Sequence, residues 1–349
     1  MRRSSSIRFI ATPCVAVLSV LLLASGCAAN KGAVTTAPSA GGPASAGKME
    51  SPHAKAELPK VIEVALRLSP GDEWKSRFVS TSETKRRLTG TDGKESVKAR
   101  NVGIELIATQ RVVGVTGSVA RVEVTETETR ILQDGKFVPA PYKQFNPPNP
   151  VSFTIDTATG KTDFSAMRQA YEKWMADVKE GPAGDIIGKT FRLPAYLAVI
   201  EDMYGKPFTR VSGRKLSAEE TPSGKDVILP FLGPGAVLPA VPVEGRMRYT
   251  DFVTKGRKHL LNVSGSYTGQ PDLSSEDELA VRLSDFGRPA PKSFTGSGSA
   301  SGRFQSSVDI LSGREERGTG QLSYTAKWVF DDATLTEEVA GKSILEPAE

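Results

Sequence analysis

Apolar and polar side chains alternate along much of this chain, and this alternation restricts the fold more than any other feature of the sequence. Over Val119–Arg130, charged residues and threonines are spaced between apolar residues so that one face of an extended strand would be in water. Successive side chains of a strand point to opposite faces, so a period of two indicates a half-buried strand. The same period recurs in four other stretches, which are Ile62–Leu68, Met247–Thr254, Lys258–Tyr267 and Gln321–Phe330.

Turn residues separate the predicted strands. Asp92-Gly93-Lys94 and Asp134-Gly135-Lys136 carry the Asp-Gly pair, which is favoured in tight hairpins because both central residues take a positive φ. Several stretches exceed the five or six residues of a typical strand. Long strands, short turns and sequential order predict a mainly β fold of the α+β class. We expect one or more large, curved antiparallel sheets with two short helices packed on them or capping them.

The two helices are predicted in the first half of the body. The first follows Ser165 and ends before Gly181-Pro182, and the second runs from Pro194 to about Tyr204 and ends at Gly205. Apolar residues in the first segment recur at the three- and four-residue spacing of one helix face.

That helix face leads to the candidate ligand site. Met167, Tyr171 and Trp174 form a methionine and aromatic stripe, which either packs on a sheet or closes an apolar cavity as a lid. The Leu-, Pro- and Gly-rich segment 227–243 contains Phe231 and Leu232. It either lines the same cavity or is a buried irregular crossover. These five residues are the pocket candidates.

Two short patterns occur twice in the same order. Ile155–Lys161 and Val308–Arg314 share an apolar residue, an Asp, a hydroxyl residue, a Gly and a basic residue. Pro70–Phe78 and Pro242–Tyr249 form a weaker pair. The repeats indicate either a duplicated body, with halves at about 58–205 and 206–349, or repeated use of common turn residues.

The first 27 residues have the pattern of an export signal. Residues 1–26 begin with three arginines and no acid, continue with an apolar run over Phe9–Leu23, and end in small residues at Gly26. The run is short of the roughly 20 residues that span a bilayer, whereas a cleaved secretory signal has these three parts. Cys27 then separates two alternatives, an ordinary secreted protein and a lipid-anchored one.

Residues 1–27 resemble the signal of bacterial lipoproteins. The resemblance implies cleavage between Gly26 and Cys27, acylation of Cys27 and stable attachment to a bilayer. The next residue is Ala28 and not Asp. The resemblance therefore implies attachment to the outer membrane in a diderm cell, and to the outer face of the plasma membrane otherwise. The body loosely resembles envelope lipoproteins made of long strands and, at the level of fold only, half-barrel lipoprotein carriers.

Composition predicts a disordered tether and argues against nucleic-acid binding. Residues 27–57 are rich in Ala, Gly, Ser and Pro and bury too little apolar surface to fold; the folded body is expected over 58–349. The chain has 45 basic and 40 acidic residues, and removing the three signal arginines leaves 42 against 40. Both cysteines, Cys14 and Cys27, lie in the signal and anchor, so the body is expected to have no disulfide.

The sequence shows no pattern typical of catalysis or of a cofactor. His259 is the one histidine of the body, and clustered His or Cys ligands for zinc are not found. Gly296–Gly302 lacks the flanking strand and helix of a dinucleotide site. We therefore expect no cofactor and a non-enzymatic, membrane-anchored binding or carrier module for an apolar or amphipathic ligand. The alternative is a structural protein of the envelope that presents sheet surfaces to a protein or glycan. The expected partners are the bilayer, through acylated Cys27, and an apolar ligand or envelope protein.

Overall fold

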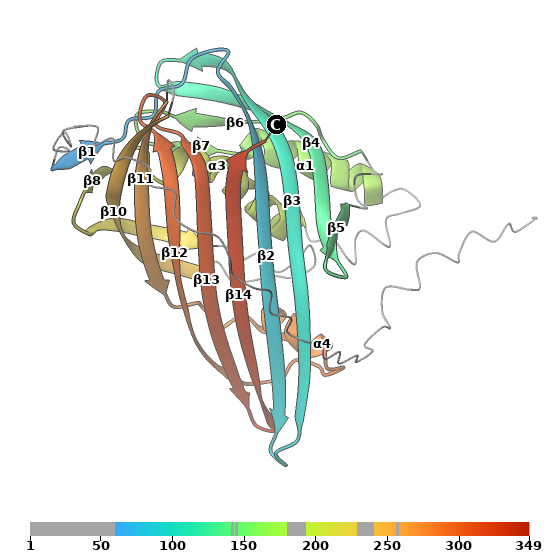
Figure 1. The fold of residues 1–349 in the computed structure, drawn as a ribbon. Coiled ribbons are helices and arrows are strands. Elements are labelled where there is room, and N and C mark those ends of the chain that lie inside the picture. Colours follow the sequence, from blue (N-terminus) through green and yellow to red (C-terminus); the bar gives the residue numbers. More distant parts are fainter. Residues whose placement is uncertain are drawn as a thin grey trace, which may run out of the picture. The chain divides into compact units, whose positions relative to one another are not determined.

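The computed structural model describes residues 60–140, 143, 146–179, 193–228, 241–255 and 258–348 (Figure 1). The chain separates into Met1–Ala56 and Glu57–Glu349, and all described elements belong to the second unit. Gly26, Cys27 and the predicted tether lie outside the described residues, so cleavage, acylation and the tether stay predictions.

One 12-stranded antiparallel sheet forms the body, as the alternation predicted. Its strands follow the order β7-β6-β4-β3-β2-β14-β13-β12-β11-β10-β9, and β5 pairs with β4. The strands curve together across Figure 1. Their bounds are β2 (Glu73–Gly90), β3 (Glu95–Thr116), β4 (Val119–Gln133), β5 (Lys136–Pro139), β6 (Val151–Asp156), β7 (Lys161–Asp163), β9 (Thr221–Ile228), β10 (Val241–Lys255), β11 (Lys258–Gly269), β12 (Thr295–Asp309), β13 (Glu315–Phe330) and β14 (Ala333–Pro347). A separate two-stranded sheet pairs β1 (Val61–Glu63) with β8 (Lys215–Ser217).

The predicted turns are present. Asp134 has φ 50° and Gly135 has φ 75°, as a tight turn between β4 and β5 requires. The repeated pattern forms the same turn twice, because Gly160 donates to the Asp156 carbonyl and Gly313 to the Asp309 carbonyl, each at 2.7 Å. Both copies belong to one continuous sheet. Duplication stays a prediction, and its proposed boundary at 205/206 falls inside a helix.

Three helices accompany the sheet in the described residues, one more than predicted. They are α1 (Ser165–Lys179), α3 (Leu193–Thr209) and α4 (Glu276–Ser284). The predicted end of the second helix at Gly205 was wrong, since α3 continues through Pro207. Gly205 serves packing instead: a Cβ there would lie 3.1 Å from the Phe164 ring. None of the described helices is long and apolar enough to cross a membrane.

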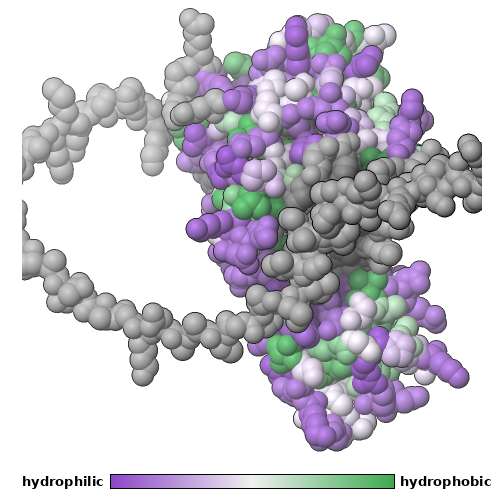
Figure 2. All heavy atoms as spheres, turned by 90° about the vertical axis from the view of Figure 1, so that its right-hand side faces the viewer, coloured by the Kyte–Doolittle hydropathy of each residue, from purple (hydrophilic) through white to green (hydrophobic). Residues whose placement is uncertain are grey.

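The helices cover one face of the sheet, here called the inner face. Helices α1 and α3 pack on β2, β3, β4 and β6 in one apolar core, the α1/α3 core, and α4 packs on β12, β13 and β14 in a second, the α4 core. A third cluster joins β10 and β11 to β8. Hydrophilic and hydrophobic residues are interspersed on the face shown in Figure 2. The exposed large apolar residues are likewise distributed over many strands, as is normal for a protein surface.

Candidate functional site

Between the cores, the inner face carries two cross-strand rows of small residues. One row joins Ser80, Ser343 and Gly320, and the next joins Ser82 and Gly341. The first row continues through Phe304 to Gly265, and the second through Leu322 and Gly302 to Tyr267 and Gly245. These rows are called the small-residue band, which consists of Ser80, Ser82, Gly245, Gly265, Gly302, Gly320, Gly341 and Ser343.

The aromatic rings fill only part of the band. The Phe304 ring covers Gly265 and the Tyr267 ring covers Gly302, because a Cβ at either glycine would lie 2.4 Å or 2.3 Å from the ring. At Gly341, by contrast, the nearest atom to a built Cβ is 3.4 Å away, which is ordinary contact distance. Gly341 therefore leaves room for a small side chain, and it lines a hollow of the inner face.

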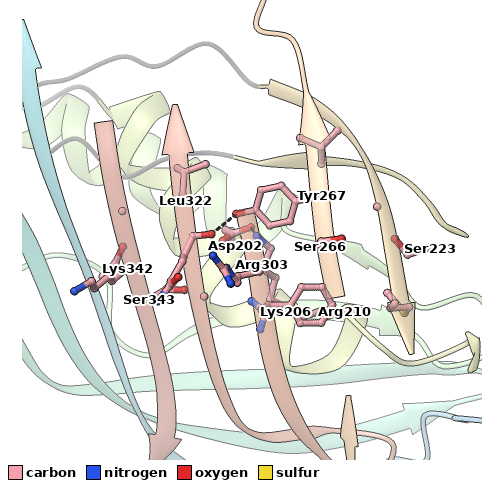
Figure 3. A pocket seen from close by; sticks show the side chains of 18 of the residues that line it. Asp202, Lys206, Arg210, Ser223, Ser266, Tyr267, Arg303, Leu322, Lys342 and Ser343 are labelled. Atoms are coloured by element: carbon pink, nitrogen blue, oxygen red, sulfur yellow. Dashed lines mark hydrogen bonds and ion pairs between the residues drawn. The ribbon is translucent and has the colours of Figure 1, made fainter. Parts of the chain in front are cut away.

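A cavity of about 130 Å³ occupies this hollow, between the small-residue band and the C-terminal part of α3 (Figure 3). Asp202, Lys206, Arg210 and Arg214 line it, together with Val243, Met247 and Leu322 from the strands. A second cavity of about 90 Å³ adjoins it and is lined in part by the same α3 side chains. The combined site has a charged wall and a partly apolar floor.

Some lining residues belong to the other face of the sheet. Arg303 and Lys342 follow or precede the inner-face residues Phe304 and Ser343, so the alternation of a strand directs their side chains outward. In Figure 3 the Lys342 side chain points away from the cavity. We therefore count only the α3-side cations as cavity cations, namely Lys206, Arg210 and Arg214.

Packing along the buried face of α3 holds the helix that carries the charged wall. The Tyr204 hydroxyl donates to the buried Glu126 carboxylate at 2.5 Å, and Gln110 donates to the Tyr204 carbonyl at 3.2 Å. At the end of the helix, the Arg314 guanidinium lies 5.6 Å from the centroid of the Phe208 ring. Burial lowers the pKa of Arg314 to about 10, so the side chain is still a cation at neutral pH.

Acidic partners hold two of the cavity cations. Lys206 Nζ lies 2.7 Å from Asp202 Oδ1, one helical turn earlier. Arg210 donates to Glu315 Oε1 at 2.8 Å, and its guanidinium lies 5.3 Å from the centroid of the Phe304 ring. Glu315 is 2 % exposed and accepts a second bond from Ser306 at 2.7 Å.

Arg214 differs from the other two cations. Its backbone is fixed, because the Val64 amide donates to its carbonyl at 3.2 Å and its own amide donates to Val211 at 3.3 Å. Its guanidinium has no ion pair or side-chain hydrogen bond to any residue that the structure describes, although it lines the cavity and is half-buried. Guanidinium groups have five N–H donors, and here these donors are available to a ligand.

The predicted pocket residues lie elsewhere. Met167, Tyr171 and Trp174 are 0 %, 0 % and 8 % exposed and pack in the α1/α3 core. Tyr171 contacts Trp174 edge-on at a centroid distance of 6.0 Å. These three residues therefore form a packed helix face and not a lid over either cavity, and none of them lines either cavity. Phe231 and Leu232 lie outside the described residues.

Sequence reasoning missed the cavity cations, although a signal was present. Asp202, Lys206, Arg210 and Arg214 are spaced four apart, which places side chains along one face of a helix. Of this series, Asp202 and Lys206 lie on α3, which the prediction ended at Gly205, and Arg210 and Arg214 follow the end of the helix at Thr209.

The one histidine of the described body packs against an aromatic ring. His259 stacks on Phe252 at a centroid distance of 5.9 Å, and its Nδ1 lies 3.3 Å from the Thr254 hydroxyl oxygen. Within the described residues no cluster of His, Cys, Asp or Glu could hold a metal ion.

Comparison with known proteins identifies no family. No family model matches the chain, and no curated protein matches it. Among solved structures, the crystal structure of Pseudomonas aeruginosa OpdQ is similar with 7 % identity and a TM-score of 0.22, over 80 % of this chain and 99 % of that one. The crystal structure of an outer membrane channel from Pseudomonas putida F1 gives 7 % identity and a TM-score of 0.16, over 81 % and 97 %. At these TM-scores, neither similarity supports an inference about this chain.

Proposed function

We propose that this chain is a membrane-anchored, non-enzymatic binding or carrier module whose ligand enters the cavity beneath α3. The observation that supports this most directly is the small-residue band. Two apolar cores flank a strip of glycine and serine that lines a cavity next to α3. A hollow with a charged wall and a partly apolar floor is typical of a ligand site.

The lining favours an amphipathic ligand over a purely apolar one. Met247 and Leu322 offer apolar contact, while Lys206 and Arg214 offer charge. Size sets a further limit, since an engineered cavity of about 150 Å³ holds one benzene molecule, whereas whole drug-sized ligands occupy roughly 300–1,000 Å³. A cavity of about 130 Å³ therefore accommodates a small molecule or one end of a larger one.

Filling the cavity tests this function. Gly341→Leu places a side chain into the hollow, and Gly114→Leu is the matched control, because a Cβ at Gly114 meets nothing within 4 Å and lies outside the cavity. Native mass spectrometry of the full-length chain is expected to detect a bound small molecule in wild type and in the control, and to detect none in Gly341→Leu. The same bound molecules in all three proteins, or none in wild type, would contradict the proposal.

The anchor has its own test. Cys27→Ser removes the thiol that lipidation requires, so the variant is expected in the soluble fraction after cell lysis, or uncleaved, while wild type sediments with membranes. A cleaved Cys27→Ser protein that still sediments with membranes would exclude the lipid anchor.

The alternative of an envelope interaction protein is favoured by one feature of β3. Residues 95–103 pair with β2 on one side, whereas β4 pairs with β3 only from Ile104 onward, and no other described strand pairs with that stretch. An unpaired strand edge can accept a strand from another protein. A photo-crosslinker at the exposed Val97 is expected to capture one reproducible partner if this second function holds, and scattered or no products would exclude it.

A further inference from the structure

We infer that the cavity recognises a phosphate group, held by Lys206, Arg210 and Arg214 against the hydroxyl groups of the small-residue band. This inference deepens the proposed function and depends on it, because it names the chemistry of the end of the ligand that enters the cavity.

The charge balance of the wall is the first support. On the α3 side, three cations line the two cavities, and the carboxylates among the lining residues are those of Asp202 and Glu315. One positive charge is therefore uncompensated, and it belongs to Arg214, whose side chain has no polar partner among the described residues. A half-buried cation is partly removed from water, so an anionic ligand gains a stronger attraction there than at an exposed site.

The orientation of donors is the second support. Glu315 and the Phe304 ring fix the plane of the Arg210 guanidinium, and the bond to Glu315 uses its Nη1 group. Arg214 is fixed through its backbone by Val64. Arginine forks match phosphate oxygens in pairs, so the oriented Arg210 guanidinium, the unpaired Arg214 guanidinium and one ammonium form a donor set that suits a tetrahedral oxyanion.

The floor supplies the remaining donors. Ser80 and Ser343 are direct partners across β2 and β14, and both line the cavities. Their hydroxyl groups lie opposite the α3 wall, so a group with oxygens on several sides can be bound from both. A carboxylate has two oxygens and a planar shape, whereas a phosphate has up to four, which favours phosphate. Phosphate also has few enough atoms for a cavity of about 130 Å³.

Asp202 is expected to weaken phosphate binding. Its carboxylate lies 2.7 Å from Lys206 Nζ, so a bound phosphate competes with it for the ammonium. Removing that charge without removing the side chain, as in Asp202→Asn, is expected to strengthen phosphate binding. A purely structural role of these cations at the helix C-terminus predicts no such gain.

Calorimetric titration of the full-length chain in detergent micelles tests the inference. The probes are inorganic phosphate, dihexanoylphosphatidic acid and acetate. Arg214→Gln and Lys206→Gln are each expected to weaken phosphate binding roughly tenfold or more, since hydrogen bonds to charged groups contribute at least that much. Lys85→Gln, which removes an exposed cation of the outer face that lines neither cavity, is the matched control and is expected to bind as wild type does.

Each outcome separates the alternatives. Binding of either phosphate probe, or of both, supports the inference. Binding of only one probe tells whether a free phosphate or a lipid headgroup is the source. Equal binding of acetate, no phosphate binding by wild type, or unchanged binding in both Arg214→Gln and Lys206→Gln overturns it. If phosphate recognition fails while Gly341→Leu still removes a bound molecule, the proposed function stands and only its phosphate chemistry is wrong.

Discussion

Removing the carboxylate of Glu337 is expected to be among the most damaging single changes to the fold. Glu337 is 0 % exposed and lies between two arginines in the α4 core. Arg86 Nε donates to it at 2.6 Å and Arg282 Nε at 2.9 Å. Arg282 also lies 4.9 Å from the centroid of the Trp328 ring, and Arg86 pairs with Asp285 just after α4.

The expected size follows from what Glu337→Ala leaves behind. Two arginines lose their shared partner in a site without water access, and breaking a buried ion pair in this way costs about 3–5 kcal/mol. The methylene groups that are deleted leave a cavity, which adds to that cost. For a body of this size, a loss of 3–5 kcal/mol lowers the midpoint of thermal unfolding by roughly 5–8 °C.

Glu338→Ala is the matched control. Glu338 is the next residue on β14, points to the outer face and is exposed, so its replacement is expected to change stability by no more than about 0.5 kcal/mol. Urea unfolding of the full-length chain, followed by circular dichroism, measures both. If Glu337→Ala and Glu338→Ala unfold at the same urea concentration, the network does not stabilise α4 on the sheet and the reasoning is refuted.

Two other predictions concern a turn and the start of α1. Gly313→Ala is expected to cost more free energy of unfolding than Gly93→Ala, because both glycines have a positive φ but only at Gly313 would the Cβ lie 2.2 Å from the Ala65 carbonyl oxygen; equal losses in urea unfolding would exclude that steric cause. The Ser165 hydroxyl and amide hold the pKa of Asp163 below 3.8, so its stabilisation is complete above about pH 4 and is lost as the pH falls through the lowered pKa. The stability difference between wild type and Asp163→Asn should therefore shrink in acid, and a difference that grows there would contradict the assignment.

Local patterns in the sequence predicted most of the fold. The alternation in Val119–Arg130 and the Asp-Gly turns depend only on neighbouring residues, and both predictions agree with the structure. Helix α4 was missed although its start was visible. Ser275 caps the helix by accepting a bond from the Glu278 amide at 3.3 Å, and a Ser followed three residues later by Glu is a known helix-start pattern.

The candidate site could not be predicted in the same way, because it depends on distant pairing. Ser82 and Gly341 become neighbours only when β2 pairs with β14, and Gly341 meets Leu322 only in the register of β13. No local pattern distinguishes these small residues from other glycines and serines of the sheet. The Met167 stripe, in contrast, had a strong local pattern, which fitted either packing on a sheet or a lid, and in the structure the stripe packs in the core.

The pairing of β14 with β2 has a consequence for how this protein is made. β14 inserts between β2 and β13 although β2 lies far earlier in the chain, so both neighbours keep a row of unpaired amides and carbonyls until β14 has been synthesised and delivered. Contacts this distant form slowly, and open strand edges invite aggregation. A nascent chain of this design therefore needs either rapid delivery of β14 or a chaperone that shields two open edges at once.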